Sequence, residues 1–471
     1  EIKLNLKDES PFYIRPFPAS ESEKEVIDKE IEKLVKMGVL KLGKGSYVSP
    51  MLLVKKKSSD GKPALRPVTD FRYLNSRIMP LHYCSPLLRD ALQLIGSSGA
   101  TIFSTLDLKN AFFSLKVHPD SQKFLTIAPY PSGRTYQYLR MPQGLSISPT
   151  EWSDKIADIL SELPKHTQYC LGIADDIIVY SKNQQEHLEH VAKVLELFEK
   201  HGLKISVSKC QFFRQNLEYM GHKITTKEGK PAITPQKSKV DSITKMERPK
   251  TPKQAKSFVG MVAFLSMYLP KLQILLAPFH HLTRKNSKFL WTEELQKNFE
   301  IIKESLQKSP VLTLPAREGK FVLYVDSSVI GTGGALFQIQ DGKERLLSFY
   351  SRKFQDAARN MTISEIECYG ILLTIQAYRY LLRSVQFEVV TDHSALLQIH
   401  KSKSEPATLR LRKYFEKLSD FNFHLRYKKG KDMFLADHLS RHPTCEVEDD
   451  RPIAFSVIYD RLCMKGVTKN Q

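Results

Sequence analysis

Two adjacent aspartates interrupt an otherwise apolar run, CLGIADDIIVY, and no other local pattern in the chain constrains the fold as strongly. Asp175 and Asp176 stand among residues that favour a buried strand. Because an unpaired buried carboxylate is strongly disfavoured, the chain must turn there or bind a cation. Asp-Asp pairs are common in hairpin turns, and a tight hairpin can also present both carboxylates to a cation. Both interpretations stay open on this pair alone.

The composition limits the class of protein. The 471 residues include 71 Lys and Arg against 51 Asp and Glu, a formal net charge of +20. Hydrophobic residues make up 41%, which is ordinary for a globular protein, and the length predicts about three domains, or two with a linker. Such a positive surplus favours polyanionic partners, with nucleic acid first and acidic membrane surfaces or acidic proteins next.

Membrane-spanning, secreted and zinc-ribbon classes can be set aside. The uncharged stretch from Ser257 to Pro270 is too short to span a bilayer and predicts a buried helix. There is no signal-peptide pattern at Glu1, and the missing start Met leads us to expect a segment of a longer polypeptide. No two cysteines have CxxC spacing, which indicates buried thiols in a reducing setting; they are Cys84, Cys170, Cys210, Cys368, Cys445 and Cys463.

The first two parts of the chain differ in character. Up to about Ile224, strand-like runs alternate with helical stretches such as EHLEHVAKVLELFEKHGL, which ends at Gly202. From Lys223 to Pro310 the pattern predicts helices separated by prolines, with 17 Lys and Arg against 7 Asp and Glu. This basic block, residues 223–310, fits either a solvated face or a surface that binds a polyanion.

A third part starts near Val311. The runs KFVLYVDSS, GGALFQI and RLLSFYSR predict three successive strands, followed by a helix, the strand QFEVVTDH and a second helical section to Arg441. Three antiparallel strands, a helix and a parallel strand make a mixed α/β sheet. The tail after His442 has too weak a pattern to predict a fold.

A third carboxylate could join the aspartate pair. Asp107 ends the strand-like run TIFSTLD. Hard oxygen ligands select Mg²⁺, and two such ions about 3.5–4 Å apart can clamp the attacking and leaving oxygens of a phosphoryl displacement. The basic stretch VKKKSSDGKPALRPVTDFRYLN offers charge for a triphosphate, although by itself it also fits a solvated loop.

A second set of carboxylates lies in the third part. Asp326 and Asp392 each end a strand-like run, Glu367 lies in the predicted helix, and Asp437 lies in LADHLSR. Each residue alone fits an ordinary turn or a solvated face. Together they are of interest because strands that end at one edge of a core can share a metal site.

The motifs VKKK…LRPVTDFRYLN, LDLKNAFFSLKVHP, YLRMPQGLSISPTEW, IADDIIVYS and LEYMGHKI occur in the order found in reverse transcriptases of retroviral type. The chain most closely resembles the Pol proteins of gypsy-type (Metaviridae) LTR retrotransposons. The text from ITPQKSKVDSI to SLQKSPVL is similar to that group's thumb and connection, and YVDSS, ECYGIL, VVTDHSAL and LADHLSR resemble the four carboxylate motifs of ribonuclease H. The resemblance covers about residues 10–442.

This resemblance implies a multidomain α/β and α+β fold, a right-hand polymerase followed by a ribonuclease H-like mixed-sheet domain. We expect fingers and palm at 1–224, thumb and connection at 225–310, ribonuclease H at 311–442 and an unassigned tail at 443–471. Given this resemblance, we expect the basic block to bind a nucleic-acid duplex along the path from one active site to the other.

The resemblance also implies roles for residues of the polymerase. Its metal ligands would be Asp107, Asp175, Asp176 and the carbonyl of Leu108. The incoming deoxynucleotide would be held or selected by Lys56, Arg66, Phe112, which crowds a ribose 2′-OH, and Gln143, which contacts the nucleotide or the template strand. Met220 and Gly221 would lie in the primer-grip strand. Without the motifs, Phe112 also fits a core residue, and the last two an ordinary strand end.

One position departs from the family. The usual Tyr two places before the aspartate pair is replaced by Ile173, which removes a hydrogen-bonding contact to the primer end. This departure puts rate and fidelity in question and leaves the reaction type unchanged.

In the ribonuclease H part, the resemblance makes Asp326, Glu367, Asp392 and Asp437 the metal ligands. Glu367 fits the motif better than the nearby Glu365, which we expect on the surface. Some relatives have a histidine ahead of the last acid, and Tyr427 stands there in this chain.

The expected function is RNA- and DNA-directed DNA synthesis joined to cleavage of the RNA strand of RNA–DNA hybrids, with two Mg²⁺ (or Mn²⁺) ions per active site. Its partners would be an RNA–DNA hybrid, a DNA duplex primer–template and dNTPs, with no membrane; a homodimer stays open. We expect processing from a larger Pol polyprotein and a cytoplasmic location within a virus-like particle. The alternative is a catalytically impaired, retroelement-derived nucleic-acid-binding protein; an endonuclease or integrase would need an acid triad that the tail lacks.

Overall fold

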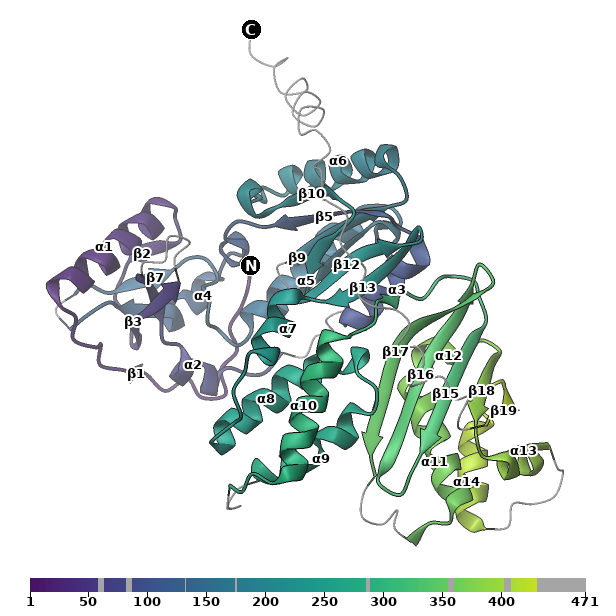
Figure 1. Ribbon diagram of the computed structural model, residues 1–471. Coiled ribbons are helices and arrows are strands. Elements are labelled where there is room, and N and C mark those ends of the chain that lie inside the picture. Colours follow the sequence, from purple (N-terminus) through teal and green to yellow (C-terminus); the bar gives the residue numbers. More distant parts are fainter. Residues whose placement is uncertain are drawn as a thin grey trace. The chain divides into compact units, whose positions relative to one another are not determined.

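The structure is a computed structural model, shown in Figure 1. It describes residues 1–57, 63–81, 87–131, 133–173, 176–284, 289–354, 360–401 and 408–429. Within these ranges, no helix has both the length and the apolar composition needed to cross a bilayer. The chain divides into two compact units, which are described separately: the first is formed by residues 1–88, 104–179 and 188–212, and the second by 89–103, 180–187 and the chain from 213 onward.

A six-stranded sheet occupies the N-terminal part of the first unit. Its strands are ordered β1-β3-β6-β7-β2, with β4 paired to β3. Their bounds are β1 (Phe12–Tyr13), β2 (Leu40–Leu42), β3 (Tyr47–Lys57), β4 (Pro63–Thr69), β6 (Thr126–Ala128) and β7 (Tyr136–Tyr138). The apolar run YVSPMLLV lies in β3, which continues through the lysines that follow.

A second sheet, ordered β10-β5-β9-β8, lies mostly in the first unit. Its strands are β5 (Ile102–Asp107), β8 (Cys170–Ile173), β9 (Asp176–Ser181) and β10 (Gln211–Arg214). Strands β8 and β9 are antiparallel, and their last pair is Ile173 opposite Asp176. Only two residues therefore separate the paired ends, as in the tight hairpin that the aspartate pair predicts.

Helices alternate with these strands along the chain. They are α1 (Glu21–Lys36), α2 (Arg72–Arg77), α3 (Leu88–Ser98), α4 (Pro119–Gln122), α5 (Ser148–Ser161) and α6 (Gln184–Lys200). The predicted helix EHLEHVAKVLELFEKHGL is confirmed as α6, and Gly202 takes a positive φ of 66° after its end. Trp152 and Ile156 of α5 are fully buried in the core of the first unit, beside Ile177 and Val179 of β9.

The second unit begins with a small antiparallel sheet and a group of helices. The sheet is ordered β11-β12-β13-β14, with β11 (Leu217–Tyr219), β12 (His222–Lys227), β13 (Lys230–Pro235) and β14 (Leu312–Thr313). The helices are α7 (Lys237–Thr244), α8 (Pro252–Phe264), α9 (Leu272–Leu282) and α10 (Glu293–Gln307). The helical prediction for the basic block was therefore wrong over residues 223–235, which form an antiparallel hairpin.

The five-stranded sheet of the second unit is ordered β17-β16-β15-β18-β19 (Figure 1). The strands are β15 (Phe321–Ser327), β16 (Gly331–Gln340), β17 (Lys343–Lys353), β18 (Phe387–Thr391) and β19 (Phe423–Tyr427), and the helices are α11 (Ile363–Ala377), α12 (Arg379–Leu382), α13 (Ser394–Lys401) and α14 (Leu409–Leu418). Strands β15, β16 and β17 pair antiparallel, and β18 runs parallel to β15, so the predicted mixed sheet is confirmed. Strand β19 falls within the section predicted to be helical, because a five-residue run beside a helix carries too little periodicity to predict a strand.

Candidate active sites

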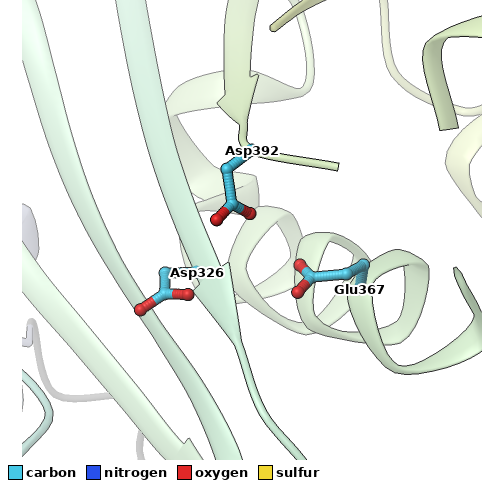
Figure 2. A group of neighbouring side chains, drawn as sticks. All are labelled: Asp326, Glu367 and Asp392. Carbon is cyan, nitrogen blue, oxygen red and sulfur yellow. The ribbon is translucent and has the colours of Figure 1, made fainter. Parts of the chain in front are cut away.

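Three of the four predicted ribonuclease H carboxylates meet at one end of the five-stranded sheet. Carboxylate oxygens of Asp326, Glu367 and Asp392 lie within 4.8 Å of one another (Figure 2). Asp326 lies near the end of β15 and Asp392 directly follows β18, and these strands are parallel neighbours, so both side chains reach the same edge. The fourth, Asp437, lies outside the described residues.

Glycine at position 370 lets α11 bring its glutamate to this edge. A Cβ at Gly370 would lie 2.0 Å from Oγ of Ser327 and 2.8 Å from Oγ1 of Thr332, so any other residue would have to displace these side chains. The helix therefore packs closely on β15 and β16, and Glu367 points toward the two aspartates (Figure 2).

The electrostatics of Glu367 fit a cation ligand. Only 6% of the residue is exposed, and its Oε2 has no hydrogen-bond partner. Burial first, and then the negative charges of Asp392 and Asp326, raise the pKa of Glu367 to about 8. A buried carboxylate with one oxygen unpartnered, beside two other carboxylates, is the donor set that a hard divalent cation satisfies.

Glu365 is not on the surface, and that expectation was wrong. It is 5% exposed and caps α11: its Oε2 accepts from the backbone N–H of Thr362, and its Oε1 accepts from the hydroxyl of Thr408 at 2.8 Å. Desolvation raises the pKa of Glu365, but these hydrogen bonds outweigh it and lower the pKa overall. The sequence TISE carried the signal, since Thr followed three places later by Glu is typical of a capping box.

A lysine that sequence analysis did not select also reaches this site. Nζ of Lys271 lies 2.6 Å from Oδ2 of Asp326. Lys271 precedes Asp326 by 55 residues, so no local pattern in the sequence could have paired them.

Two of the three predicted polymerase aspartates come together in the first unit. Asp107 ends β5 and Asp176 begins β9, and these strands are neighbours. Partial desolvation first, and then the charge of Asp107, raise the pKa of Asp176. Nζ of Lys209 lies 3.3 Å from Oδ1 of Asp107, a contact that sequence analysis also missed. Asp175 lies outside the described residues.

The backbone at Leu108 turns its carbonyl away from the segment beside it. The carbonyl of Asp107 accepts from the N–H of Ser206 at 2.8 Å, and the N–H of Lys109 donates to the carbonyl of Lys204 at 2.7 Å. In an antiparallel pair, the residue between two such bonds points its own N–H and C=O to the opposite side. The carbonyl of Leu108 is therefore free of this pairing, as its predicted role as a ligand requires.

Two of the predicted nucleotide-binding residues contact each other. Arg66 of β4 donates from Nη2 to Oε1 of Gln143 at 2.5 Å, and both side chains are exposed. Phe112 lies in a short 3₁₀ helix, η1 (Ala111–Ser114), and packs edge-on against Trp152 while staying partly exposed. Its roles as a core residue and as a ring that crowds the ribose both stay predictions. Lys56 lies in β3, but its side chain is outside the described part of the chain.

Met220 and Gly221 form a turn directly after β11, as at an ordinary strand end, and do not lie within a strand; their role in a primer grip stays a prediction. Both residues have positive φ, 48° and 79°, and they separate β11 from β12. A Cβ at Gly221 would lie 2.0 Å from Nζ of Lys239, which lies over the ring of Phe264 at 3.7 Å. The turn is thus packed against α7 and α8.

The residue after the turn anchors it further. Nδ1 of His222 and the hydroxyl of Tyr268 are hydrogen-bonded at 2.8 Å, and both residues are buried. Burial first, and then the charge of Lys239, lower the pKa of His222 to about 4, so the ring is neutral at physiological pH.

Comparison with known proteins agrees with this geometry. Residues 54–224 match the family described as reverse transcriptase (RNA-dependent DNA polymerase), and residues 291–389 match the RNase H-like domain found in reverse transcriptase. The Tf2-7 and Tf2-3 transposon polyproteins of Schizosaccharomyces pombe are each 31% identical over 464 residues, which is 97% of this chain and 34% of the polyprotein. The chain therefore spans about a third of the length of these relatives.

Solved structures show the same fold. The foamy viral protease–reverse transcriptase dRH in complex with double-stranded DNA is 22% identical with a TM-score of 0.76, covering 89% of this chain and 72% of that one. The foamy viral protease–reverse transcriptase with double-stranded DNA is 21% identical with a TM-score of 0.74, covering 91% and 89%.

The chain thus has the fold of these structures, with one region that matches the reverse transcriptase family and one that matches the RNase H-like domain found in reverse transcriptase. Over nearly all of its length the chain is similar to transposon polyproteins, in agreement with the resemblance that its motifs indicate.

Proposed function

We propose that this chain synthesises DNA on RNA and DNA templates at Asp107, Asp175 and Asp176, and cleaves the RNA strand of RNA–DNA hybrids at Asp326, Glu367, Asp392 and Asp437. The observation that carries the proposal is the convergence of three carboxylates, one buried and without a hydrogen-bond partner on Oε2, inside a domain of RNase H type. When bound, two divalent ions per site would activate the attacking oxygen and stabilise the leaving oxygen.

In the polymerase, the residues of the chain hold and orient the reactants. The primer 3′-oxygen attacks the α-phosphate of the incoming dNTP, and pyrophosphate leaves. Asp107 and Asp176 would hold the ions through their negative charge, and Arg66, hydrogen-bonded to Gln143, presents a planar guanidinium to the triphosphate. Phe112 excludes a ribose 2′-OH by its bulk, which favours deoxynucleotides.

In the ribonuclease H domain, a water molecule attacks the RNA phosphodiester and the 3′-oxygen leaves. Glu367 is carried by α11, whose close packing at Gly370 holds the carboxylate beside the two aspartates. Such preorganised negative charge avoids the cost of reorienting groups during the reaction.

The proposed partners are RNA–DNA hybrids, DNA duplex primer–templates and dNTPs. The similar foamy viral protease–reverse transcriptases have been solved in complex with double-stranded DNA and with an RNA/DNA hybrid. The basic block supports a similar role here, since its net charge is positive and α8 carries the exposed Lys253 and Lys256. We further propose release from a larger Pol polyprotein and a cytoplasmic place within a virus-like particle, and leave a homodimer open.

The test is extension of a labelled DNA primer on an RNA template with Mg²⁺ and dNTPs, run beside Asp176→Asn. Extension by the unchanged chain alone supports the polymerase and shows that Ile173 is tolerated beside the aspartates. If neither protein extends the primer while both bind the hybrid tightly, the alternative of a catalytically impaired nucleic-acid-binding protein replaces the proposal.

A further inference from the structure

Three residues on neighbouring strands form a straight row beside the ribonuclease H carboxylates. Asp326 of β15 lies opposite Gly333 of β16, and Gly333 lies opposite Ser351 of β17. Side chains of residues directly opposite each other project from the same face of a sheet. The row therefore offers a hydroxyl, a gap without a side chain, and a carboxylate in succession.

The start of α9 lies across this row. The backbone N–H of Gln273 donates to Oγ of Ser351 at 2.8 Å, and α9 packs along β17. The stem of Lys271 passes over the gap, because a Cβ at Gly333 would lie 3.1 Å from Cγ and 3.7 Å from Cε of Lys271. Its ammonium then reaches Asp326 at 2.6 Å.

The backbone of Lys271 has a strained conformation, which indicates that its surroundings fix the position of the side chain. Its φ of 52° and ψ of 21° are left-handed, a conformation that costs energy for any residue with a Cβ. Such strain persists where the surroundings determine the conformation, and it is frequent at functional sites. Here the hydroxyl of Ser351, the gap at Gly333 and the charge of Asp326 provide those surroundings.

We propose that the ammonium of Lys271 competes with divalent ions for Asp326 in the ribonuclease H site. Its ammonium neutralises Asp326 while no ion is bound, and an ion that binds Asp326, Glu367 and Asp392 must displace it. The pair is partly exposed, 48% for Lys271 and 34% for Asp326, so the ammonium can be displaced, and a lone positive charge opposes the divalent ion that replaces it. The inference rests on the proposed function of this domain.

The proposal is tested by metal binding, which does not depend on activity. Binding of Mn²⁺ is titrated by electron paramagnetic resonance in the full chain with Asp107→Asn and Asp176→Asn, so that the polymerase site contributes little. Added to this background, Lys271→Met keeps the length of the stem and removes the charge; we expect about threefold to tenfold tighter Mn²⁺ binding. The matched control is Lys253→Met on α8, also an exposed lysine of the basic block, which should leave binding unchanged.

A second variant keeps the test valid if Lys271→Met does not fold. Gly333→Ala leaves Lys271 in place but crowds its stem at Cγ, so it should tighten Mn²⁺ binding in the same direction by a smaller factor. Unchanged or weaker binding in both variants would overturn the inference.

Failure of the underlying function gives a different result. Asp392→Asn in the same background should abolish the Mn²⁺ site whatever Lys271 does. If Asp392→Asn leaves the Mn²⁺ binding of the background protein unchanged, the proposed ribonuclease H site is wrong. The inference about Lys271 is then wrong as well. If that site exists and only Lys271→Met and Gly333→Ala are without effect, the inference alone is wrong.

Discussion

Glu367 lies where a negative charge is costly when no cation is bound. Its carboxylate is buried, one oxygen has no hydrogen-bond partner, and Asp392 and Asp326 are close. These surroundings favour the protonated form, whereas a divalent ion would favour the charged form. The same residue therefore links proton binding, metal binding and the stability of its domain.

This linkage predicts how stability depends on pH without metal. The pKa of Glu367 rises from 4.5 to about 8 on folding, so between these values the folded state keeps a proton that the unfolded state has released. Stability must then fall as the pH rises through this window. In EDTA, we expect the melting temperature of the unchanged chain to fall more between pH 5.5 and pH 8 than that of Glu367→Gln.

The measurement is thermal unfolding of both proteins at both pH values, since other groups that titrate are common to the two. Addition of Mg²⁺ at pH 8 should raise the melting temperature of the unchanged chain and have a smaller effect on the variant. Equal pH dependence in the two proteins would contradict the raised pKa.

At the scale of elements, the turn between β11 and β12 shows how a short loop depends on two neighbouring helices. Gly221 has a positive φ, and the space that its Cβ would occupy is filled by the ammonium of Lys239, which lies over the ring of Phe264. Side chains of α7 and α8 thus pack against the turn where glycine has no side chain.

We expect Gly221→Ala to lower the free energy of unfolding by about 1–2 kcal/mol from the left-handed backbone alone, with a further loss from displacement of Lys239. The preceding residue gives a matched control: Met220 has a φ of 48°, so Met220→Gly should relieve strain and leave stability equal or higher. Urea unfolding of the three proteins measures this, and an unchanged midpoint for Gly221→Ala would show that this packing does not stabilise the turn.

The elements also show what the sequence could predict. Long periodic runs gave α6, and apolar strand-like runs gave the mixed sheet of β15 to β18, because their pattern follows directly from which face is buried. The turn at Met220 was not predicted, because methionine is not a residue type that indicates a left-handed backbone. Strand β19 was not predicted, because five residues carry little periodicity.

In the candidate sites, too, some residues could be predicted from the sequence and others could not. Asp326, Glu367 and Asp392 were found from family motifs that mark strand and helix positions, and the structure brings their oxygens together. The ion pairs from Lys209 and Lys271 could not be found, because they depend on how segments far apart in the chain pack.

At the scale of the whole molecule, the two carboxylate sites belong to different compact units and different sheets. Asp107 and Asp176 lie on β5 and β9 in the first unit, whereas Asp326 and Asp392 lie at the ends of β15 and β18 in the second. No strand is shared between the two sheets. An Asp→Asn change keeps the size of the side chain and removes its charge, so its effect should stay within its own site.

We therefore expect Asp176→Asn to reduce primer extension by about 100-fold or more and to leave cleavage of an RNA–DNA hybrid within about twofold of the unchanged chain. Asp392→Asn should do the reverse. Both activities are measured on the same hybrid, labelled on the primer and on the RNA, with circular dichroism as the check that each variant is folded. If either substitution removed both activities in a folded protein, the two sites would not act independently, and the assignment of one reaction to each carboxylate cluster would fail.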